Sequence, residues 1–410
     1  MPKRFENEAA YDVLFVGEQT SLVMRLVAAL VRAGYRPAIL NGPALVEKLH
    51  VECGVDADHF ACPPVQLPGR YKAPVIRTLE WPMQRSRLRN AIRRINPAVI
   101  HVNYIKAEHS LLTEIGADCP PMVSTVWGTD LHGDAADGDR TERRRIAKVL
   151  QHSEVITADS LELLDCAREL APQKTDVQFK LVLWGIDVDA FSNAAADESA
   201  RQWRQRLEVP ADAPVVLAPR RIDPRYSPER VLDAFAKTQA ARSGFCVFKI
   251  FGDNPRTERR QQDMLSELAQ KLGIADRVRF APACAYGDLP GLYRMANVAC
   301  MLLSHDGTPT TAFELMAAST PLVMSDIPDY EGMIVDGEHA WLAPPADSDA
   351  AATVIDRILA EPRDVQPQLE RARTWVLKHA TIDATVDNFL AAYRQACRAS
   401  SPRSVTNLAE

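Results

Sequence analysis

Apolar runs alternate with helical patterns from the beginning of the sequence. Val13–Val16 is a four-residue apolar run that ends at Gly17, which is typical of a buried strand. From Leu22 to Ala33 the apolar residues recur on one helical face, Gly34 ends this helix, and Pro37–Leu40 predicts a second strand. A strand, a helix and a second strand form a βαβ unit, which implies a parallel sheet.

The same alternation continues through the first half of the chain. The predicted strands are Val99–Asn103, Met122–Val126, Val155–Thr157 and Gln178–Leu183, and the helices between them include Gln84–Ile95 and Asp139–Gln151. We therefore expect a doubly wound α/β domain over residues 1–197.

The alternation lapses over the polar, alanine-rich segment Ser192–Asp212, which we take as the domain boundary. It then restarts. The predicted strands are Val215–Leu217, Val247–Phe251, Val278–Phe280, Val298–Leu303 and Leu322–Met324; the predicted helices are Glu229–Gln239, Arg259–Leu272, Pro309–Ala318, Ala350–Ala360 and Thr385–Arg398. This pattern predicts a second Rossmann-like domain over residues 205–375, a helix over residues 376–398 and a flexible tail over residues 399–410.

Composition narrows the class of protein. The 410 residues carry a net charge of −6, with 47% hydrophobic and 25% charged residues, as in ordinary globular proteins. No global basic excess favours nucleic acid as a partner. The eight cysteines form no C-x-x-C pair, which argues against a zinc ribbon or a disulfide framework and favours a reducing compartment. Without a signal-like apolar segment or a run of 18 apolar residues, a cytoplasmic location is expected.

Two doubly wound domains facing each other predict a cleft lined by the loops that follow the strands. The richest loop runs from Ser304 to Glu314. Thr308 is a suitable N-cap and Pro309 suits the first helical position, so the N–H groups of Thr310 and Thr311 would form an anion site.

Two carboxylates flank this anion site. Asp306 and Glu314 could accept hydrogen bonds from hydroxyls on both sides of a diphosphate. The alternative interpretation is a capped helix with a solvated aspartate and glutamate.

Two further loops follow strands in the second half. Arg220, Arg221 and Arg225 form either a fork-type phosphate clamp or a solvated turn. Gly252, in a third loop, would permit close approach of the backbone to a ligand.

The first half offers a similar group of loops. Trp127, Asp130 and His132 follow one strand, and Gly17 and Glu18 close the first strand and face the same cleft. The alternatives are a turn aspartate and a core tryptophan.

Together these loops resemble the retaining glycosyltransferases of family GT4, which have the GT-B fold, over roughly Asp12 to Tyr393. The strongest match is the segment DGTPTTAFELMAASTPLVMSDIP, in which Asp306 and Glu314 fall on the two acidic positions of the family's E-x7-E motif. The segments WGTD, ITADS, WGID and DGEHAWLAPPA and the residue Arg221 match in the same order.

This resemblance implies a nucleotide diphosphate sugar as donor, held mainly by the second domain. Glu314 would accept the ribose hydroxyls. Asp306 and the backbone after it, including Gly307, would hold the sugar. Arg221, with Arg220, and the helix N-terminus would stabilise the diphosphate.

Asp130 and Gly17 would come from the first domain, near acceptor and sugar, and the last helix would cross back onto that domain. The candidate catalytic residues are Asp130, Arg221 and Asp306. No metal is needed in this family, because cationic side chains and a helix dipole neutralise the leaving group.

The chain departs from the GT4 pattern at three places. Tyr226 stands where the family has a lysine, with Arg225 beside it; Glu18 replaces a second glycine; and Trp127 replaces a histidine, whose place His132 could take. These departures leave the identities of donor and acceptor open.

The segment Arg77–Arg94 predicts a basic helix with apolar residues interspersed. Such a helix can lie on an anionic membrane surface, or it can be an ordinary surface helix that packs its apolar face on the sheet.

The sequence thus predicts a metal-independent retaining glycosyltransferase of polysaccharide, lipopolysaccharide or other glycoconjugate synthesis, with a glycan or lipid-linked acceptor. A GT-B nucleotide-sugar epimerase and a non-catalytic GT-B subunit of a transferase complex are the alternatives.

Overall fold

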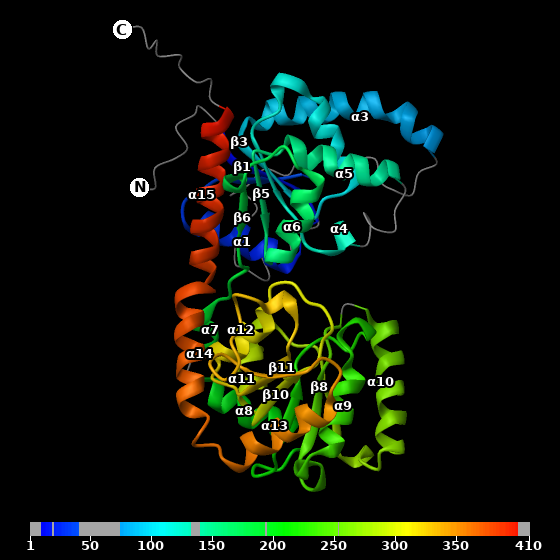
Figure 1. The fold of residues 1–410 in the computed structure, drawn as a ribbon, viewed down its shortest axis with the longest axis vertical. Helices are drawn as coiled ribbons and strands as arrows, with labels where there is room; N and C mark the ends of the chain where they lie inside the picture. Colours follow the sequence, from blue (N-terminus) through cyan, green and yellow to red (C-terminus); the bar gives the residue numbers. More distant parts are fainter. Residues whose placement is uncertain are drawn as a thin grey trace. The chain divides into compact units, whose positions relative to one another are not determined.

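The computed structural model describes residues 10–18, 20–40, 74–132, 140–192, 195–252 and 254–400. The chain divides into two compact units (Figure 1). Unit 1 comprises the chain up to Leu183 together with the segment from Ile382 onward, and unit 2 is the continuous stretch Trp184–Thr381.

Unit 1 contains a six-stranded sheet in the order β2-β1-β3-β4-β5-β6, with all neighbours parallel. Its strands are β1 (Tyr11–Gly17), β2 (Pro37–Ile39), β3 (Pro97–Asn103), β4 (Met122–Thr125), β5 (Val155–Ala158) and β6 (Phe179–Leu181). Nearly all residues of β1 to β5 are buried, as expected for a parallel sheet covered on both faces.

The helices of unit 1 connect these strands. They are α1 (Ser21–Arg32), α3 (Pro74–Ile95), α4 (Thr129–His132), α5 (Arg140–His152), α6 (Leu161–Leu170) and α15 (Ile382–Ser400), with the 3₁₀ helices η2 (Ala107–Glu114), η3 (Gly116–Asp118) and η4 (Asp176–Gln178). Thr20 caps α1 and Ser160 caps α6, in each case by accepting a hydrogen bond from a backbone N–H with the side chain.

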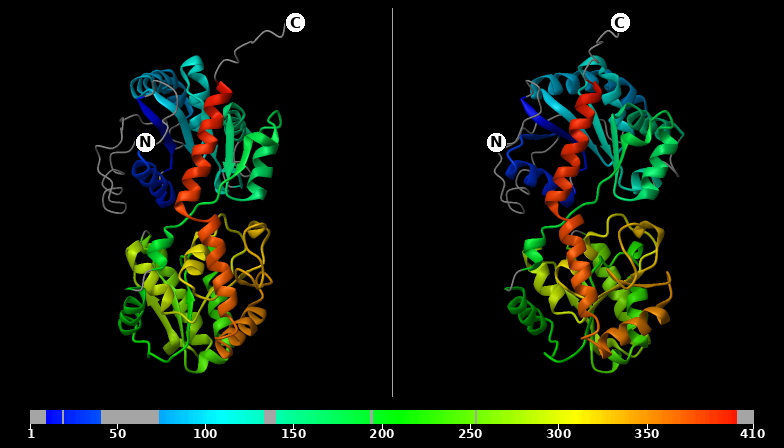
Figure 2. Two further views of the ribbon diagram at one scale, coloured as in Figure 1. Left: turned by 90° about the vertical axis from the view of Figure 1, so that its left-hand side faces the viewer. Right: turned by 60° about the vertical axis from the view of Figure 1, so that its left-hand side comes forward.

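Helix α15 belongs to unit 1 although it follows all of unit 2 in the sequence. It packs against α1 and across β3, β4 and β5 (Figure 2, red helix). The contact is fixed by a buried polar chain: the Tyr393 hydroxyl lies 2.7 Å from Nδ1 of His101, and Nε2 of His101 lies 2.6 Å from Oγ1 of Thr125. Burial lowers the pKa of His101 to about 3, so the ring is neutral.

Unit 2 contains a second parallel sheet of six strands, in the order β12-β11-β10-β7-β8-β9. Its strands are β7 (Val215–Ala218), β8 (Phe245–Lys249), β9 (Val278–Ala281), β10 (Val298–Met301), β11 (Leu322–Ser325) and β12 (Trp341–Ala343). This is the Rossmann order, in which the direction of strand addition reverses between β7 and β10.

Helices cover both faces of this sheet. They are α7 (Val188–Ser192), α8 (Ala195–Arg206), α9 (Pro228–Lys237), α10 (Pro255–Lys271), α11 (Leu289–Arg294), α12 (Thr310–Ala317), α13 (Ser348–Ala360) and α14 (Gln366–His379). The 3₁₀ helices are η5 (Pro224–Tyr226), η6 (Gln239–Arg242), η7 (Ala275–Arg277), η8 (Tyr286–Asp288) and η9 (Pro328–Tyr330).

The predicted pair of doubly wound domains is confirmed, but the segment between them differs from expectation. The alanine-rich stretch after Ser192 is a helix, α8, rather than an irregular linker. Helices α7 and α8 pack on α11 and α12 of unit 2, which is why the units divide after Leu183 and not at residues 197–205. The second crossing lies between Thr381 and Ile382, inside the predicted helix 376–398, and residues 401–410 of the predicted tail lie outside the described part of the chain.

We expect Tyr393→Phe to lower the free energy of unfolding of unit 1 by about 1–3 kcal/mol, because it leaves a buried imidazole nitrogen of His101 without a partner. Urea unfolding followed by circular dichroism measures this change. Tyr35→Phe is the control, since the Tyr35 hydroxyl lies at the longer distance of 3.4 Å from its partner Arg394. Equal stability of Tyr393→Phe and the wild type would contradict the importance of this contact.

Candidate functional site

The loops predicted to carry the chemistry of unit 2 lie at the strand-order reversal. The loop after β7 and the loop after β10 leave neighbouring parallel strands at the same edge of the sheet. Because the connections that follow turn away in opposite directions, a crevice opens there, the usual ligand site of doubly wound sheets.

An ion pair joins these two loops. Arg220 donates from one guanidinium nitrogen to Oδ1 of Asp306 at 2.9 Å, and from the other to the Thr311 hydroxyl at 3.3 Å. The side chains of Arg220 and Asp306 are 17% and 6% exposed. Burial raises the pKa of Asp306, against the opposing effect of the guanidinium. Arg220, which the sequence predicts to bind the donor, therefore forms an ion pair with Asp306.

Two tyrosines complete this network. The Tyr330 hydroxyl donates to Oδ2 of Asp306 at 3.1 Å, while the backbone N–H of Gly307 donates to Oδ1, also at 3.1 Å. Tyr226, the residue in place of the family's lysine, lies under the guanidinium of Arg220, with 4.4 Å from Cζ to the ring centroid. Tyr226 thus holds an arginine in place.

The three predicted arginines make ion pairs and aromatic contacts, and their role as a phosphate clamp stays a prediction. Arg225 is exposed and makes a two-bond ion pair with Asp223, whose carboxylate also caps η5. Arg221 lies over the ring of Phe251, with 4.9 Å from Cζ to the centroid. The Cζ of Arg225 also lies 5.9 Å from the ring centroid of Tyr226, so Arg220 and Arg225 share that ring, whereas Arg221 contacts Phe251.

Helix α12 begins one residue later than predicted. Thr310 is its first residue and Pro309 occupies the N-cap, so the prediction of a Thr308 cap is wrong. The Thr308 hydroxyl instead accepts from the backbone N–H of Trp184 at 3.5 Å, and the Thr310 N–H donates to the Thr308 carbonyl at 2.8 Å.

Glu314 lies on the second turn of α12 and is buried. Its Oε2 accepts a hydrogen bond of 3.0 Å from the hydroxyl of Tyr293, on α11, and burial raises the pKa of that tyrosine. Tyr293 thus orients one oxygen of this buried carboxylate.

Lys249, the last residue of β8, is a site residue that the motif analysis missed. Burial lowers the pKa of its ammonium, an effect that Glu314 opposes and that Arg220 and Arg221 reinforce. The signal in the sequence is a lysine that ends an apolar strand, FCVFK.

Gly252 has a conformational role. Its φ is +81°, and a Cβ there would lie 2.9 Å from the Cβ of Ala283. Its N–H donates to both carboxylate oxygens of Glu258 at 3.0 Å, so this loop is capped from α10. Asp253 lies outside the described residues.

In unit 1 the strand order reverses between β1 and β3, and Gly17 and Asn103 face each other there. Gly17 has a φ of +108°, and a Cβ would come within 1.9 Å of the Asn103 carbonyl, so only glycine fits. Asn103 is fully buried, and neither atom of its amide has a partner within the part of the chain that the structure describes.

Asp130 is also fully buried, and it joins the loops after β3 and β4. One carboxylate oxygen accepts from the backbone N–H of Trp127 at 2.9 Å, and the other accepts from that of Ile105 at 3.0 Å. Burial raises its pKa to about 6, although these hydrogen bonds oppose the shift. Its predicted catalytic role stays a prediction; the visible contacts position the two loops.

The remaining acceptor-side residues lie at the same edge of this sheet. Glu18 pairs with Lys106, with 2.6 Å from Oε1 to Nζ, and the Trp127 side chain is half-buried. His132 ends α4, but its side chain lies outside the described part of the structure.

A family comparison bears on unit 2. Residues 199–375 match the family model described as glycosyl transferases group 1, and this range spans β7 to most of α14. This part of the chain is similar to the group 1 glycosyl transferases. The resemblance to the GT4 enzymes is therefore confirmed.

A curated relative agrees with this assignment. A protein of Thermomonospora curvata named D-inositol 3-phosphate glycosyltransferase is 32% identical over 217 residues, which are 51% of this chain and 49% of that protein. The match therefore spans about half the length of that relative.

Solved structures share the fold over nearly the whole chain. A glycosyltransferase from Rickettsia africae has a TM-score of 0.75 at 16% identity and covers 96% of this chain and 100% of its own. A sucrose-phosphate synthase from Thermosynechococcus elongatus has a TM-score of 0.74 at 21% identity, with coverages of 95% and 99%. At these identities the likeness concerns the fold, and the predicted GT-B fold is confirmed.

No helix in the described ranges combines the length and apolarity needed to cross a membrane.

The raised pKa of Asp130 gives a testable pH dependence. Between pH 3.8 and about 6 the folded protein binds this proton more tightly than the unfolded chain, so stability falls as the pH rises through that window. The free energy of unfolding of the wild type relative to Asp130→Asn should fall by about 2 kcal/mol between pH 4 and pH 7. Urea unfolding at several pH values measures this difference. A difference that does not change with pH would contradict the prediction.

Proposed function

We propose that the protein is a retaining glycosyltransferase that moves a sugar from a nucleotide diphosphate sugar to an acceptor without a metal ion. One observation carries the proposal. A buried carboxylate, Glu314, and buried or half-buried cations from β7 and β8 gather at the strand-order reversal of a domain similar to the group 1 glycosyl transferases.

The donor would bind along this edge of unit 2. Glu314 would accept hydrogen bonds from the ribose hydroxyls, while Arg221 would lie by the diphosphate. When the bond between the anomeric carbon and the diphosphate oxygen breaks, negative charge develops on the diphosphate, and a cation already in place stabilises it. Positive side chains would thus supply what a divalent ion supplies in other transferases.

Asp306 fits a role in holding the sugar. Its carboxylate accepts from Arg220, Gly307 and Tyr330, which uses about three of its roughly four acceptor positions. The remaining position on Oδ2 would accept one sugar hydroxyl. Because Arg220, Gly307 and Tyr330 hold the carboxylate in one orientation, only a sugar hydroxyl at the matching position would reach this oxygen.

The acceptor would be a glycan, a lipid-linked saccharide or another glycoconjugate, bound through residues of unit 1. The buried amide of Asn103, which has no partner among the described residues, supports this assignment, since a buried amide is stabilised by a hydroxyl partner. Curated relatives are named D-inositol 3-phosphate glycosyltransferases, so D-inositol 3-phosphate belongs in the first set of acceptors tested.

The donor assignment is tested by calorimetry with UDP-, GDP- and ADP-sugars in the presence of EDTA. We expect one nucleotide class to bind, and Glu314→Gln to weaken that binding about 10- to 100-fold, as loss of a charge-assisted hydrogen bond implies. Glu331→Gln, at an exposed glutamate near the same sheet edge, is the matched control. Equal affinities of Glu314→Gln and the wild type would contradict the role of Glu314.

The same assay separates the alternatives. Transfer to an acceptor, with the anomeric configuration of the product read by NMR, supports a retaining transferase. Conversion of the donor sugar without any acceptor would instead indicate an epimerase. Failure of every nucleotide sugar to bind would favour a non-catalytic subunit.

We also propose that unit 1 contacts the cytoplasmic face of an anionic membrane through α3. Leu88 and Ile92 are buried against the core, so the outer face of this helix consists mainly of exposed arginines: Arg85, Arg87, Arg93 and Arg94. Arg89 and Arg93 lie next to Asp118. Met83 is the one large apolar side chain exposed on the described part of this helix. The side chain of Arg77 is not among those that the structure describes. Binding would therefore be mainly electrostatic.

Replacement of Arg85, Arg87 and Arg94 by glutamine should weaken binding to vesicles containing phosphatidylserine about 100-fold, at roughly 1 kcal/mol for each arginine. Co-sedimentation at low salt measures it. The control is the glutamine triple variant of Arg256, Arg259 and Arg260, which are exposed on α10 of unit 2. Similar binding by both triple variants would refute a specific role of α3.

A further inference from the structure

An ammonium group is buried at the ligand edge of the unit 2 sheet. Lys249 is 6% exposed and ends β8, directly beside β7, which leads into Arg220 and Arg221. Because side chains alternate along a strand, Lys249 points to the face opposite Phe248, a residue of the main core cluster. Its Nζ lies 3.8 Å from the ring centroid of Phe251.

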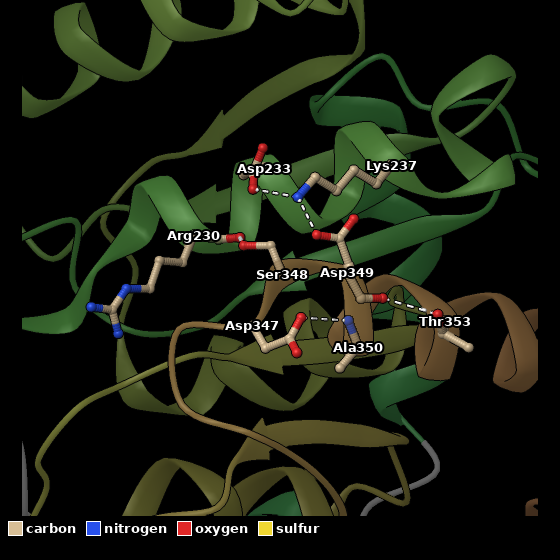
Figure 3. Close-up of polar contacts among 8 residues, drawn as sticks. All are labelled: Arg230, Asp233, Lys237, Asp347, Ser348, Asp349, Ala350 and Thr353. Atoms are coloured by element: carbon tan, nitrogen blue, oxygen red, sulfur yellow. Dashed lines mark hydrogen bonds and ion pairs between the residues drawn. The ribbon is translucent and has the colours of Figure 1, made fainter.

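The surroundings of Lys249 differ from those of another lysine in the same unit. Lys237, on α9, lies between two carboxylates, with its Nζ 3.0 Å from Asp233 and 3.0 Å from Asp349 (Figure 3). Lys249 has no carboxylate within ion-pair distance among the residues that the structure describes. A buried ammonium without a counter-ion is costly, which favours a site where an anionic ligand supplies the charge.

The charges around Lys249 indicate which ligand this is. Arg221 and Lys249 both contact the ring of Phe251, with 4.9 and 3.8 Å from the charged group to its centroid. Two cations that share one aromatic ring define a small positive region. Glu314 favours the charged ammonium but makes no ion pair with it, so Lys249 itself keeps room for an anionic ligand.

The loop after β7, the neighbour of β8, carries Tyr226. At position 226 the side chain is a tyrosine and carries no charge, and its ring packs against the guanidinium of Arg220. A lysine on β8 reaches the same crevice from the neighbouring strand. Lys249 thus offers a further cation from the next strand of the sheet.

We propose that Lys249 binds the diphosphate of the nucleotide donor, together with Arg221. The inference rests on the proposed function, since it takes a nucleotide diphosphate sugar as the ligand. It assigns Lys249 a direct contact with phosphate oxygens and Arg220 a positioning role.

The test compares nucleoside diphosphates with nucleosides. Lys249→Met keeps the length of the side chain and removes the charge, and Lys237→Met is the matched control in the same unit. Calorimetry with UDP, GDP and ADP, and with uridine, guanosine and adenosine, should show that Lys249→Met weakens the bound diphosphate about 10- to 100-fold. It should leave the affinity for the nucleoside within about twofold, and the dependence of diphosphate binding on salt should become weaker.

Other outcomes overturn the proposal. Unchanged diphosphate affinity would show that Lys249 does not contact the phosphates, and an equal loss for diphosphate and nucleoside would show a merely structural role. If the wild type binds none of the diphosphates, the proposed function fails first and this inference fails with it. Circular dichroism checks folding; where Lys249→Met does not fold, Lys249→Gln, which is neutral but polar, carries the same comparison.

Discussion

The site of unit 2 depends on the ion pair between Arg220 and Asp306. These residues are 86 positions apart in the sequence, and they meet because β7 and β10 are neighbours at the strand-order reversal. The pair fixes two loops that have no backbone ladder between them, and Tyr226 and Tyr330 support one partner each. The residues that we assign to donor binding, Glu314 on α12 and Lys249 on β8, lie at the same edge of the sheet as this ion pair.

Much of the fold could be predicted because parallel strands are short apolar runs. Val215–Leu217 and Val298–Leu303 were recognisable for this reason, and the matching strands are fully buried. Two kinds of element escaped the pattern. Helix α8 is polar and rich in alanine, with only one side packed on α11, and β12 is a three-residue edge strand that is half-buried. Their positions are decided by tertiary packing, which the local pattern does not encode.

The site was predictable to the level of its loops but not of its contacts. Glu314 and Asp306 were found because the loop after a strand in this fold faces ligands. The contacts of Arg220, Arg221 and Arg225 depend on where the turn capped by Asp223 places the ring of Tyr226 and where the loop after β8 places that of Phe251, which no motif encodes. Lys249 escaped notice because its importance comes from the pairing of β8 with β7, a relation between distant segments.

Unit 1 is discontinuous, whereas unit 2 is one unbroken stretch inserted into it. During synthesis, the strands of unit 1 leave the ribosome first. The face of β3 around His101 is covered by α15, which is made only after all of unit 2. Unit 2 contains all of its own strands and can complete its core earlier. The half of the protein that is translated first is therefore completed last, and its unfinished sheet is the surface that a chaperone would have to shield.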